Sequence, residues 1–372
     1  MLRSAEEAIL ALPLAPSDSE GADKGELGEA GEQSWLSGKT MAYLSPVIEY
    51  AAEGALRVIL PVPMLGCVAL WQQRLRASGV TQTVEWGVRV EPSCERPHES
   101  ALPGVRNIIA VASGKGGVGK STTAVNLAAA LQAEGANVGV LDADIHGPSQ
   151  PTMWGLADRG QPDVTSDNRL IPFRIHDVQV MSMGFLVTPK TPTVWRGPMV
   201  SGAFRQLLQQ TAWQDVDYLI VDMPPGTGDI QLTLSQHVPV DGSVIVTTPQ
   251  DIACLDARKG IEMFRKVRVP VLGLVENMAM FHCPNCGAAA SIFGTEGGHR
   301  LASEYEVPLL ARLPLMQEIR EQTDAGTLPV FRDPDGAIST LYRCLAREVA
   351  VALRESGDQA SHGVPEIEIC DD

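Results

Sequence analysis

The stretch SGKGGVGKST (113–122) has the composition of a phosphate-binding loop. It fits the pattern GxxxxGK[ST] with Gly114, Gly119, Lys120 and Ser121. Glycines let the backbone curl so that its N–H groups point at phosphate oxygens, and a following helix adds the positive end of its dipole. Lys120 is expected to reach the β- and γ-phosphates, and Ser121 to hold Mg²⁺. The stretch therefore predicts a site for a nucleoside triphosphate with magnesium.

A second lysine, Lys115, lies within this loop, where the ordinary motif does not require one. One interpretation is a solvated loop residue. The other is a charge that reaches a phosphate across a dimer interface and stabilises the transferring phosphoryl group, as an arginine finger does. Both interpretations remain open at this point.

Carboxylates follow two further strand-like runs, in LDADIHGPS and VDMPPGTGD. In open α/β sheets the ligand site lies at the carboxyl ends of the strands, so Asp222 is the expected Walker-B-type partner of Mg²⁺, with Gly226 in the turn after it. Asp144 is a candidate for orienting the attacking water. Asp142 has two possible roles, either support of Mg²⁺ or the lysine, or capping of the following turn.

The segment FHCPNCGAAA (281–290) holds Cys283 and Cys286 in a CxxC pattern, and the chain has no second CxxC. Two cysteines are half of the four-ligand set that tetrahedral zinc and iron–sulfur sites commonly use. Pro284 and Gly287 suit a tight turn around a metal. Zinc, an iron–sulfur cluster and a reversible dithiol remain alternatives. A thioredoxin-type dithiol is disfavoured, because it would lie at a helix N-terminus after the first strand.

Composition argues against several classes of function. The chain has 372 residues, a hydrophobic fraction of 44% and a net charge of -16. Such an acidic chain is a poor general binder of nucleic acid, because phosphate contacts need an excess of lysine and arginine. No apolar run reaches transmembrane length, the N-terminal stretch is a poor secretory signal, and the cysteine spacing does not suggest a disulfide framework. We therefore expect a cytoplasmic protein that binds neither nucleic acid nor membrane.

The elements that position these residues follow from an alternation of apolar runs and helical patterns. The alternation predicts an α/β fold with a doubly wound, mostly parallel sheet that helices cover on both faces. This domain is expected to span 105–354 and to close with a helix over 338–354, after a linker at 93–104 and before a disordered acidic tail at 355–372. Its strands are expected at 107–113, 137–144, 216–224, 242–248, 269–277 and 307–314.

The N-terminal region, 1–92, is expected to form a separate small α+β domain. Strand patterns at 55–62 and 80–92 flank an amphipathic helix at 66–78, which together predict a β–α–β unit. The segment 14–40 is rich in Gly, Ser and acidic residues, so we expect it to be flexible.

These motifs together resemble the Mrp/ApbC family of ATPases, which are iron–sulfur carriers of the deviant Walker A group. That group also includes the Min and Par positioning ATPases and the nitrogenase iron protein, and its members work as nucleotide-sandwich dimers. The N-terminal β–α–β unit is similar to a short iron–sulfur-assembly domain that some members carry. The resemblance covers roughly residues 105–335 and rests on SGKGGVGKSTT, LDADIHGPS, WRGPM, DYLIVDMPPGTGDIQLT, TTPQDIACLDARKGIEMF, VENMAMFHCPNCG and PLLARLPLMQEIRE.

The resemblance implies a role for each matching residue. Lys115 acts across the dimer and contributes to catalysis with Lys120 and Asp144, the last of which lies in switch I. Asp222 lies in switch II and contacts Mg²⁺ through water. Asn277 fits the adenine-reading asparagine of the group, and the alternative is a turn residue at a strand end. The loop residues expected to bind ATP are Gly114, Lys115, Gly116, Gly117, Val118, Gly119, Lys120, Ser121 and Thr122.

The resemblance also implies how the two-cysteine half of a four-ligand set is completed. Two chains related by a two-fold axis would each contribute Cys283 and Cys286 and hold one [4Fe–4S] cluster between them. It implies an ATPase of slow turnover that passes the cluster to apo iron–sulfur proteins and can receive it from an assembly scaffold.

Two alternatives for function are less well supported by the sequence. A positioning ATPase of Min or Par type with a structural zinc site would need a membrane-seeking helix or a basic DNA surface, and neither is visible. An electron-transfer reductase like the nitrogenase iron protein would have two widely separated cysteines rather than CxxC.

Overall fold

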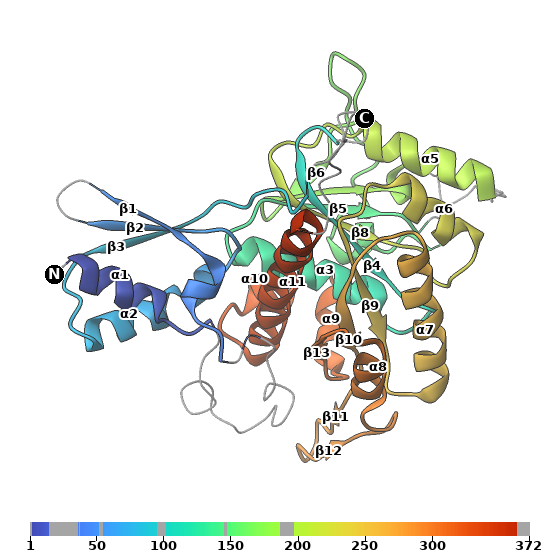
Figure 1. The fold of residues 1–372 in the computed structure, drawn as a ribbon. Coiled ribbons are helices and arrows are strands. Elements are labelled where there is room, and N and C mark those ends of the chain that lie inside the picture. The colour runs from blue at the N-terminus through green and yellow to red at the C-terminus, as the bar shows by residue number, and fades with distance from the viewer. Residues whose placement is uncertain are drawn as a thin grey trace, which may run out of the picture.

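The structure, a computed structural model, shows two units, a small one at the N-terminus and a larger α/β unit (Figure 1). It describes residues 2–14, 36, 38–51, 55–94, 102–144, 147–186 and 197–362. Several predicted features therefore fall outside the described residues: most of the flexible segment, most of the linker, Trp195 and Arg196 of WRGPM, and the end of the acidic tail.

An eight-stranded sheet forms the centre of the larger unit, in the order β13-β10-β9-β4-β8-β5-β7-β6. All neighbouring strands are parallel except β6 and β7, which are antiparallel. The predicted doubly wound, mostly parallel sheet is confirmed. The strands are Val105–Ala112 (β4), Val138–Asp142 (β5), Phe173–Ile175 (β6), Val178–Ser182 (β7), Val216–Asp222 (β8), Gly242–Thr247 (β9), Val271–Glu276 (β10) and Leu309–Arg312 (β13).

Helices cover both faces of this sheet, with α3 and α11 on one side and α7 on the other (Figure 1). The central strands are buried along their whole length, which explains why they appear in the sequence as continuous apolar runs. None of the described helices combines the length and hydropathy needed to cross a bilayer. The helices are Lys120–Ala133 (α3), Gln150–Met153 (α4), Gly197–Gln210 (α5), Asp229–His237 (α6), Asp251–Lys266 (α7), Gly297–Tyr305 (α8), Gln317–Asp324 (α9), Pro329–Arg332 (α10) and Ala337–His362 (α11).

Two features of this unit differ from the prediction. The hairpin of β6 and β7 was not predicted, because β6 has only three residues and none of them is buried. The closing helix α11 continues to His362, so the prediction of a disordered tail is wrong for residues 355–362. Contact with the N-terminal unit supports these extra turns, since Glu355 pairs with Lys39 at 3.1 Å.

The N-terminal unit contains the predicted β–α–β arrangement within shorter bounds. Its two parallel strands, β2 and β3, are joined by α2, and β1 adds an antiparallel edge that was not predicted. Leu14 is buried and its N–H donates to the Lys39 carbonyl at 2.9 Å, so the predicted flexible segment 14–40 is held at both ends. The elements are Leu2–Leu10 (α1), Val47–Tyr50 (β1), Leu56–Leu60 (β2), Val68–Ala77 (α2) and Val84–Val88 (β3), with short 3₁₀ turns at Met41–Leu44 and Leu65–Cys67.

Glu134 joins the two units at the C-terminal end of α3. Its Oε1 accepts hydrogen bonds from Arg343 Nε at 2.7 Å and Arg347 Nη2 at 2.6 Å, while Oε2 accepts the Gly66 N–H at 2.8 Å. The carboxylate is fully buried, and a buried charge is tolerated when it is paired and hydrogen-bonded in this way. The far end of the helix that follows the phosphate loop is thereby anchored.

Candidate functional site

The predicted phosphate loop joins β4 to α3 at the carboxyl edge of the sheet. Gly119, directly before α3, has a φ of 86°, in the left-handed region that favours glycine. A Cβ at Gly119 would collide with Asn277 Nδ2, and a Cβ at Gly114 would collide with the backbone of Asp256 on α7. These two glycines therefore allow the loop to pass close to its neighbours, as a cradle for phosphate requires.

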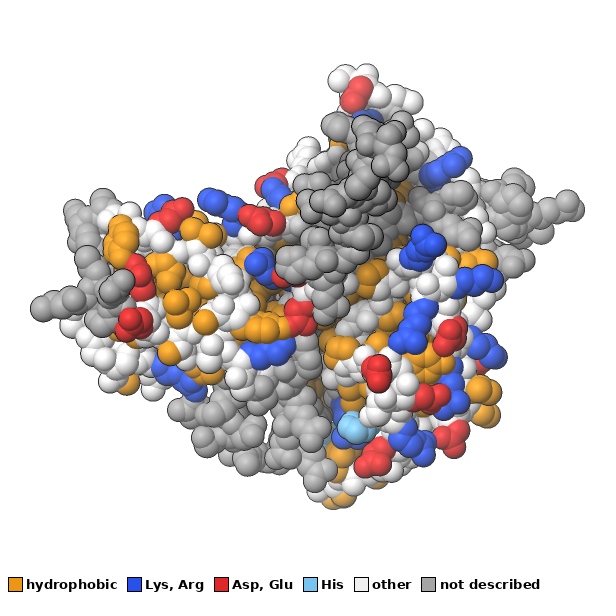
Figure 2. All heavy atoms as spheres, in the orientation of Figure 1, with side chains coloured by type: hydrophobic (Ala, Val, Ile, Leu, Met, Phe, Trp, Pro, Cys, Tyr) orange, Lys and Arg blue, Asp and Glu red, His pale blue; other side chains and the backbone are white. Residues whose placement is uncertain are grey.

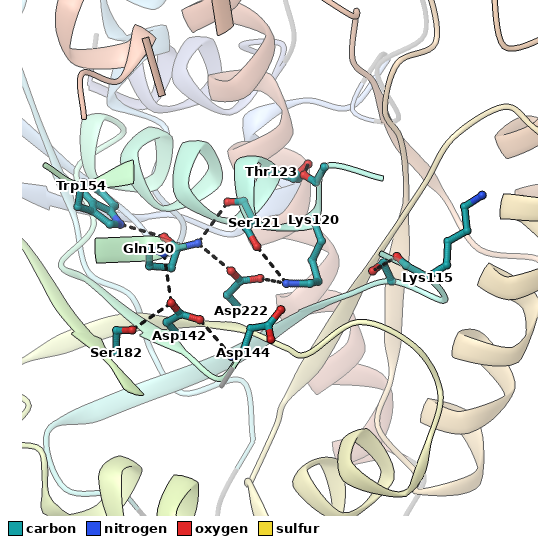
Figure 3. A network of polar contacts seen from close by, with 12 residues as sticks. Lys115, Lys120, Ser121, Thr123, Asp142, Asp144, Gln150, Trp154, Ser182 and Asp222 are labelled. Carbon is teal, nitrogen blue, oxygen red and sulfur yellow. Dashed lines mark hydrogen bonds and ion pairs between the residues drawn. The ribbon is translucent and has the colours of Figure 1, made fainter. Parts of the chain in front are cut away.

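Lys120 and Asp222 form a buried ion pair at the base of this loop (Figure 3). Lys120 Nζ lies 2.5 Å from Asp222 Oδ1 and donates to Ser121 Oγ at 3.1 Å. A positive charge thus lies between a carboxylate and a hydroxyl, which are the oxygen ligands that Mg²⁺ prefers. The donor set fits a magnesium nucleotide, with Ser121 and Asp222 as the residues that would hold the metal.

Asp142, the last residue of β5, is fully buried and holds the turn that follows it. Its Oδ1 accepts the Asp144 N–H at 3.1 Å, and Oδ2 accepts the Gln150 N–H at 3.1 Å and the Ser182 hydroxyl at 3.0 Å. Of the two predicted roles, these contacts are those of a turn cap. Burial, and then the nearby charge of Asp222, raises the pKa of Asp142 to about 8.

This raised pKa predicts an effect on stability. An aspartate in an unfolded chain titrates near pH 4, so between about pH 4 and 8 the folded chain binds more protons and stability falls as pH rises. Asp142→Asn cannot titrate, so its unfolding midpoint should fall less than that of wild type between pH 5 and 8. Calorimetry at several pH values measures this, with Asp144→Asn as the matched control. If the unfolding midpoint changed equally with pH in wild type and in Asp142→Asn, this would contradict the raised pKa of Asp142.

Most of the other predicted residues lie around the same loop. The Gly226 N–H donates to the Ser113 carbonyl at 3.0 Å, and Asn277 Nδ2 donates to the Val118 carbonyl at 2.9 Å. Asp144 is half-buried, and its backbone is tied to Asp142 in the same network (Figure 3). Lys115 is the exception, because its side chain points away from the network of Lys120 and Asp222 (Figure 3). The roles of these residues in binding and catalysis remain predictions.

Three members of this network were not predicted from the sequence: Gln150, Trp154 and Ser182. Gln150 Nε2 donates to Asp222 Oδ2 at 2.9 Å, and Trp154 Nε1 donates to Gln150 Oε1 at 3.1 Å. No local motif marks these residues, because their contacts join segments that are far apart in the sequence. The only sequence feature that could have identified them is that Gln150 and Ser182 are polar residues next to buried positions.

Cys283 and Cys286 lie in the turn of a two-stranded hairpin, Phe281–His282 (β11) and Ala289–Ala290 (β12), which protrudes beyond α8 (Figure 1). The Cys283 N–H donates to the Ala288 carbonyl at 3.0 Å, and the Gly287 N–H donates to the Cys283 carbonyl at 2.8 Å. Gly287 has a φ of 70°, so a glycine is favoured at this position of the turn. The hairpin presents both thiols at the surface of the molecule.

The electrostatics of this turn favour a metal-binding thiolate. Backbone N–H groups of Asn285 and Cys286, and then the Cys286 thiol, hydrogen-bond to Cys283 and lower its pKa. The thiolate is the form of cysteine that binds metals. In the part of the chain that the structure describes, no three Cys, His, Asp or Glu side chains are grouped as metal ligands. The turn therefore offers two cysteine side chains, which are half of a four-ligand set.

Charges of both signs are interspersed on the surface of α7 and α8 (Figure 2). Arg258 pairs with Glu304 at 2.6 Å, and Arg300 pairs with Asp251 at 2.9 Å. Such paired charges do not form the continuous basic surface that binds a phosphate backbone.

The parallel sheet, the glycine loop and the Lys120–Asp222 pair define a P-loop nucleotide-binding protein. A family model described as ParA, the NUBPL iron-transfer P-loop NTPases, matches residues 104–350. The chain belongs to this family, which confirms the resemblance drawn from its motifs.

Relatives of this chain share most of its length. An iron–sulfur cluster carrier protein of Pseudomonas fragi is 60% identical over 264 residues, which cover 69% of this chain and 92% of the relative. The mouse iron–sulfur cluster transfer protein NUBPL is 48% identical over 297 residues, covering 79% of this chain and 92% of the relative. A nucleotide-binding protein of Archaeoglobus fulgidus, solved with ADP and cobalt, superposes with a TM-score of 0.56 at 37% identity, covering 63% of this chain and 91% of that chain.

Proposed function

We propose that this chain is an ATP-hydrolysing carrier that holds a [4Fe–4S] cluster between two copies and passes it to apo-proteins. The observation that carries the proposal is the exposed hairpin with Cys283 and Cys286, two thiols on a P-loop NTPase whose relatives are named cluster carrier and transfer proteins. Membership of the iron-transfer family favours this function over a positioning ATPase of Min or Par type with structural zinc.

The nucleotide site supports ATP as the substrate that drives the cycle. Lys120 would contact the β- and γ-phosphates, Ser121 and Asp222 would hold Mg²⁺, and Asp144 would orient the attacking water. Phosphate oxygens compete with Asp222 for the ammonium of Lys120, so nucleotide binding changes the partners of a buried carboxylate. The segment after β8 would respond to that change, and slow hydrolysis then acts as a switch between holding and releasing the cluster.

A short path connects the nucleotide site to the cysteine hairpin. Asn277 directly follows β10 and donates to the Val118 carbonyl in the phosphate loop, and the chain reaches Cys283 soon afterwards. The segment between them is tied down, since the Ala279 N–H donates to the Leu313 carbonyl at 2.9 Å and the Leu315 N–H donates to the Met280 carbonyl at 2.7 Å. Movement of the loop on binding ATP would therefore be passed to the hairpin.

An apolar pair beside the phosphate loop is the proposed contact surface of the homodimer. Ile252 and Leu255 lie one turn apart on α7 with exposed fractions of 70% and 52%. Asp256, the next residue, touches Gly114, so the pair borders the loop from which Lys115 points outward. Exposed apolar side chains of this kind are typical of the buried centre of an interface. In a dimer formed here, Lys115 could reach the phosphate bound by the other copy.

Substitutions that introduce negative charges on this surface test the proposed dimer and the proposed function together. Ile252→Glu with Leu255→Glu should weaken dimerisation in ATP analogue and Mg²⁺ by about 100-fold or more, because two apolar contacts are lost in each copy. The variant should also keep little iron after anaerobic reconstitution and should not activate an apo-protein that requires a [4Fe–4S] cluster. Val47→Glu, which changes an exposed residue on β1 of the N-terminal unit, is the matched control. A dimer with full iron in the double variant would refute this interface.

A further inference from the structure

Gln150, the first residue of α4, connects three parts of the nucleotide site and is fully buried. Its Nε2 donates to Asp222 Oδ2 at 2.9 Å and to the Ser121 carbonyl at 3.3 Å. Its backbone N–H donates to Asp142 Oδ2 at 3.1 Å. One residue thus joins the ends of β5 and β8 to the start of α3 (Figure 3).

Trp154 determines which way the amide of Gln150 faces. The indole Nε1 can only donate, and it lies 3.1 Å from Gln150 Oε1. The amide oxygen must therefore face the indole, and both amide hydrogens face Asp222 and Ser121. A flipped amide would place two acceptors together at Asp222 and two donors together at Trp154. Trp154 is itself 1% exposed, so packing holds its ring in place.

The two oxygens of Asp222 have different partners. Oδ1 is bound by Lys120, which the phosphates of ATP would also attract, whereas Oδ2 is bound by the neutral amide of Gln150. When Lys120 turns to phosphate, the amide of Gln150 still holds the carboxylate. A carboxylate held on one oxygen presents the other in a fixed direction, which would suit a water ligand of Mg²⁺, because this metal keeps its ligands in strict positions.

We propose that Gln150 is a positioning residue for the ATPase reaction, which orients the carboxylate of Asp222 for Mg²⁺ and ties the turn after Asp142 to it. Gln150 contacts neither phosphate nor metal in this role, and it acts through Asp222. The inference rests on the proposed function, because it applies to magnesium-dependent hydrolysis of ATP by this chain.

Gln150→Met tests the positioning role because it keeps the volume of the side chain and removes its donors. Hydrolysis rates are measured against free Mg²⁺ at saturating ATP. The half-saturating Mg²⁺ concentration should rise about tenfold, the size expected for loss of a hydrogen bond to a charged group. Affinity for fluorescent ATP in EDTA should stay within about twofold of wild type, since the phosphate loop is intact. A residue that only fills space would leave the Mg²⁺ dependence unchanged.

Trp154→Phe provides a second, independent variant. It keeps the buried ring and removes the donor that fixes the amide, so the half-saturating Mg²⁺ concentration should rise about threefold. The double variant with Gln150→Met should be no worse than Gln150→Met alone, because Trp154 acts through Gln150. The measurement on Trp154→Phe alone remains informative even if Gln150→Met lowers the unfolding midpoint.

The possible outcomes separate the two levels of the proposal. Wild-type dependence on Mg²⁺ in Gln150→Met, or additive effects in the double variant, would overturn the positioning role and leave the proposed function intact. A wild-type protein that hydrolyses no ATP at any Mg²⁺ concentration would overturn both.

Discussion

Lys120→Met is expected to lower the rate of ATP hydrolysis by about 100-fold or more. Lys120 is the buried cation of the phosphate loop, and removing a charge aimed at the transferring phosphoryl group has an effect of this size. The variant should also fail to support transfer of the cluster to an apo-protein. Hydrolysis is measured as released phosphate at saturating ATP and Mg²⁺.

The control for this variant is Lys266→Met, at the exposed end of α7. It makes the same chemical change away from the loop, so its rate should stay within about twofold of wild type. If Lys120→Met hydrolysed ATP at a rate within about threefold of wild type and still transferred the cluster normally, the proposed role of Lys120 and ATP in the mechanism would be wrong.

Cys283→Ala and Cys286→Ala are each expected to lower bound iron to below about one tenth of the wild-type level. In a symmetric dimer each single substitution removes two of the four thiolates, and a cluster held by the remaining two is not retained. Iron and sulfide are measured after anaerobic reconstitution. Cys94→Ala, which removes another exposed cysteine, should bind iron as wild type does. Retention of iron by either hairpin variant would show that the cluster lies elsewhere.

The parts of this protein that could be predicted from sequence depend on local patterns. The phosphate loop follows from the spacing of Gly114, Gly119, Lys120 and Ser121 between a strand and a helix. The parallel sheet follows from uninterrupted apolar runs, because strands buried on both faces have no alternating pattern. The cysteine pair Cys283 and Cys286 can likewise be predicted as a metal-binding turn, because the turn consists of only a few consecutive residues.

The parts that could not be predicted depend on contacts between distant segments. Gln150 belongs to the site because its side chain donates hydrogen bonds to Asp222 and to the Ser121 carbonyl. No sequence pattern around Gln150 indicates these contacts. The last turns of α11 lie against the N-terminal unit, where Glu355 pairs with Lys39, and this contact cannot be seen in their local composition, which favours disorder. Asp142 was correctly placed at a strand end, but its contacts to Ser182 and Gln150 depend on the tertiary fold.

The bridging of one cluster by two copies of the chain is best tested by the intact mass of the reconstituted wild-type protein under anaerobic conditions. We expect two chains with one [4Fe–4S] cluster, that is about four irons and four sulfides for each dimer and no zinc. Disruption of the dimer at Ile252 and Leu255 should release the cluster. One zinc for each chain, which iron does not displace, would contradict the bridged cluster and make the hairpin a structural knuckle on a nucleotide switch.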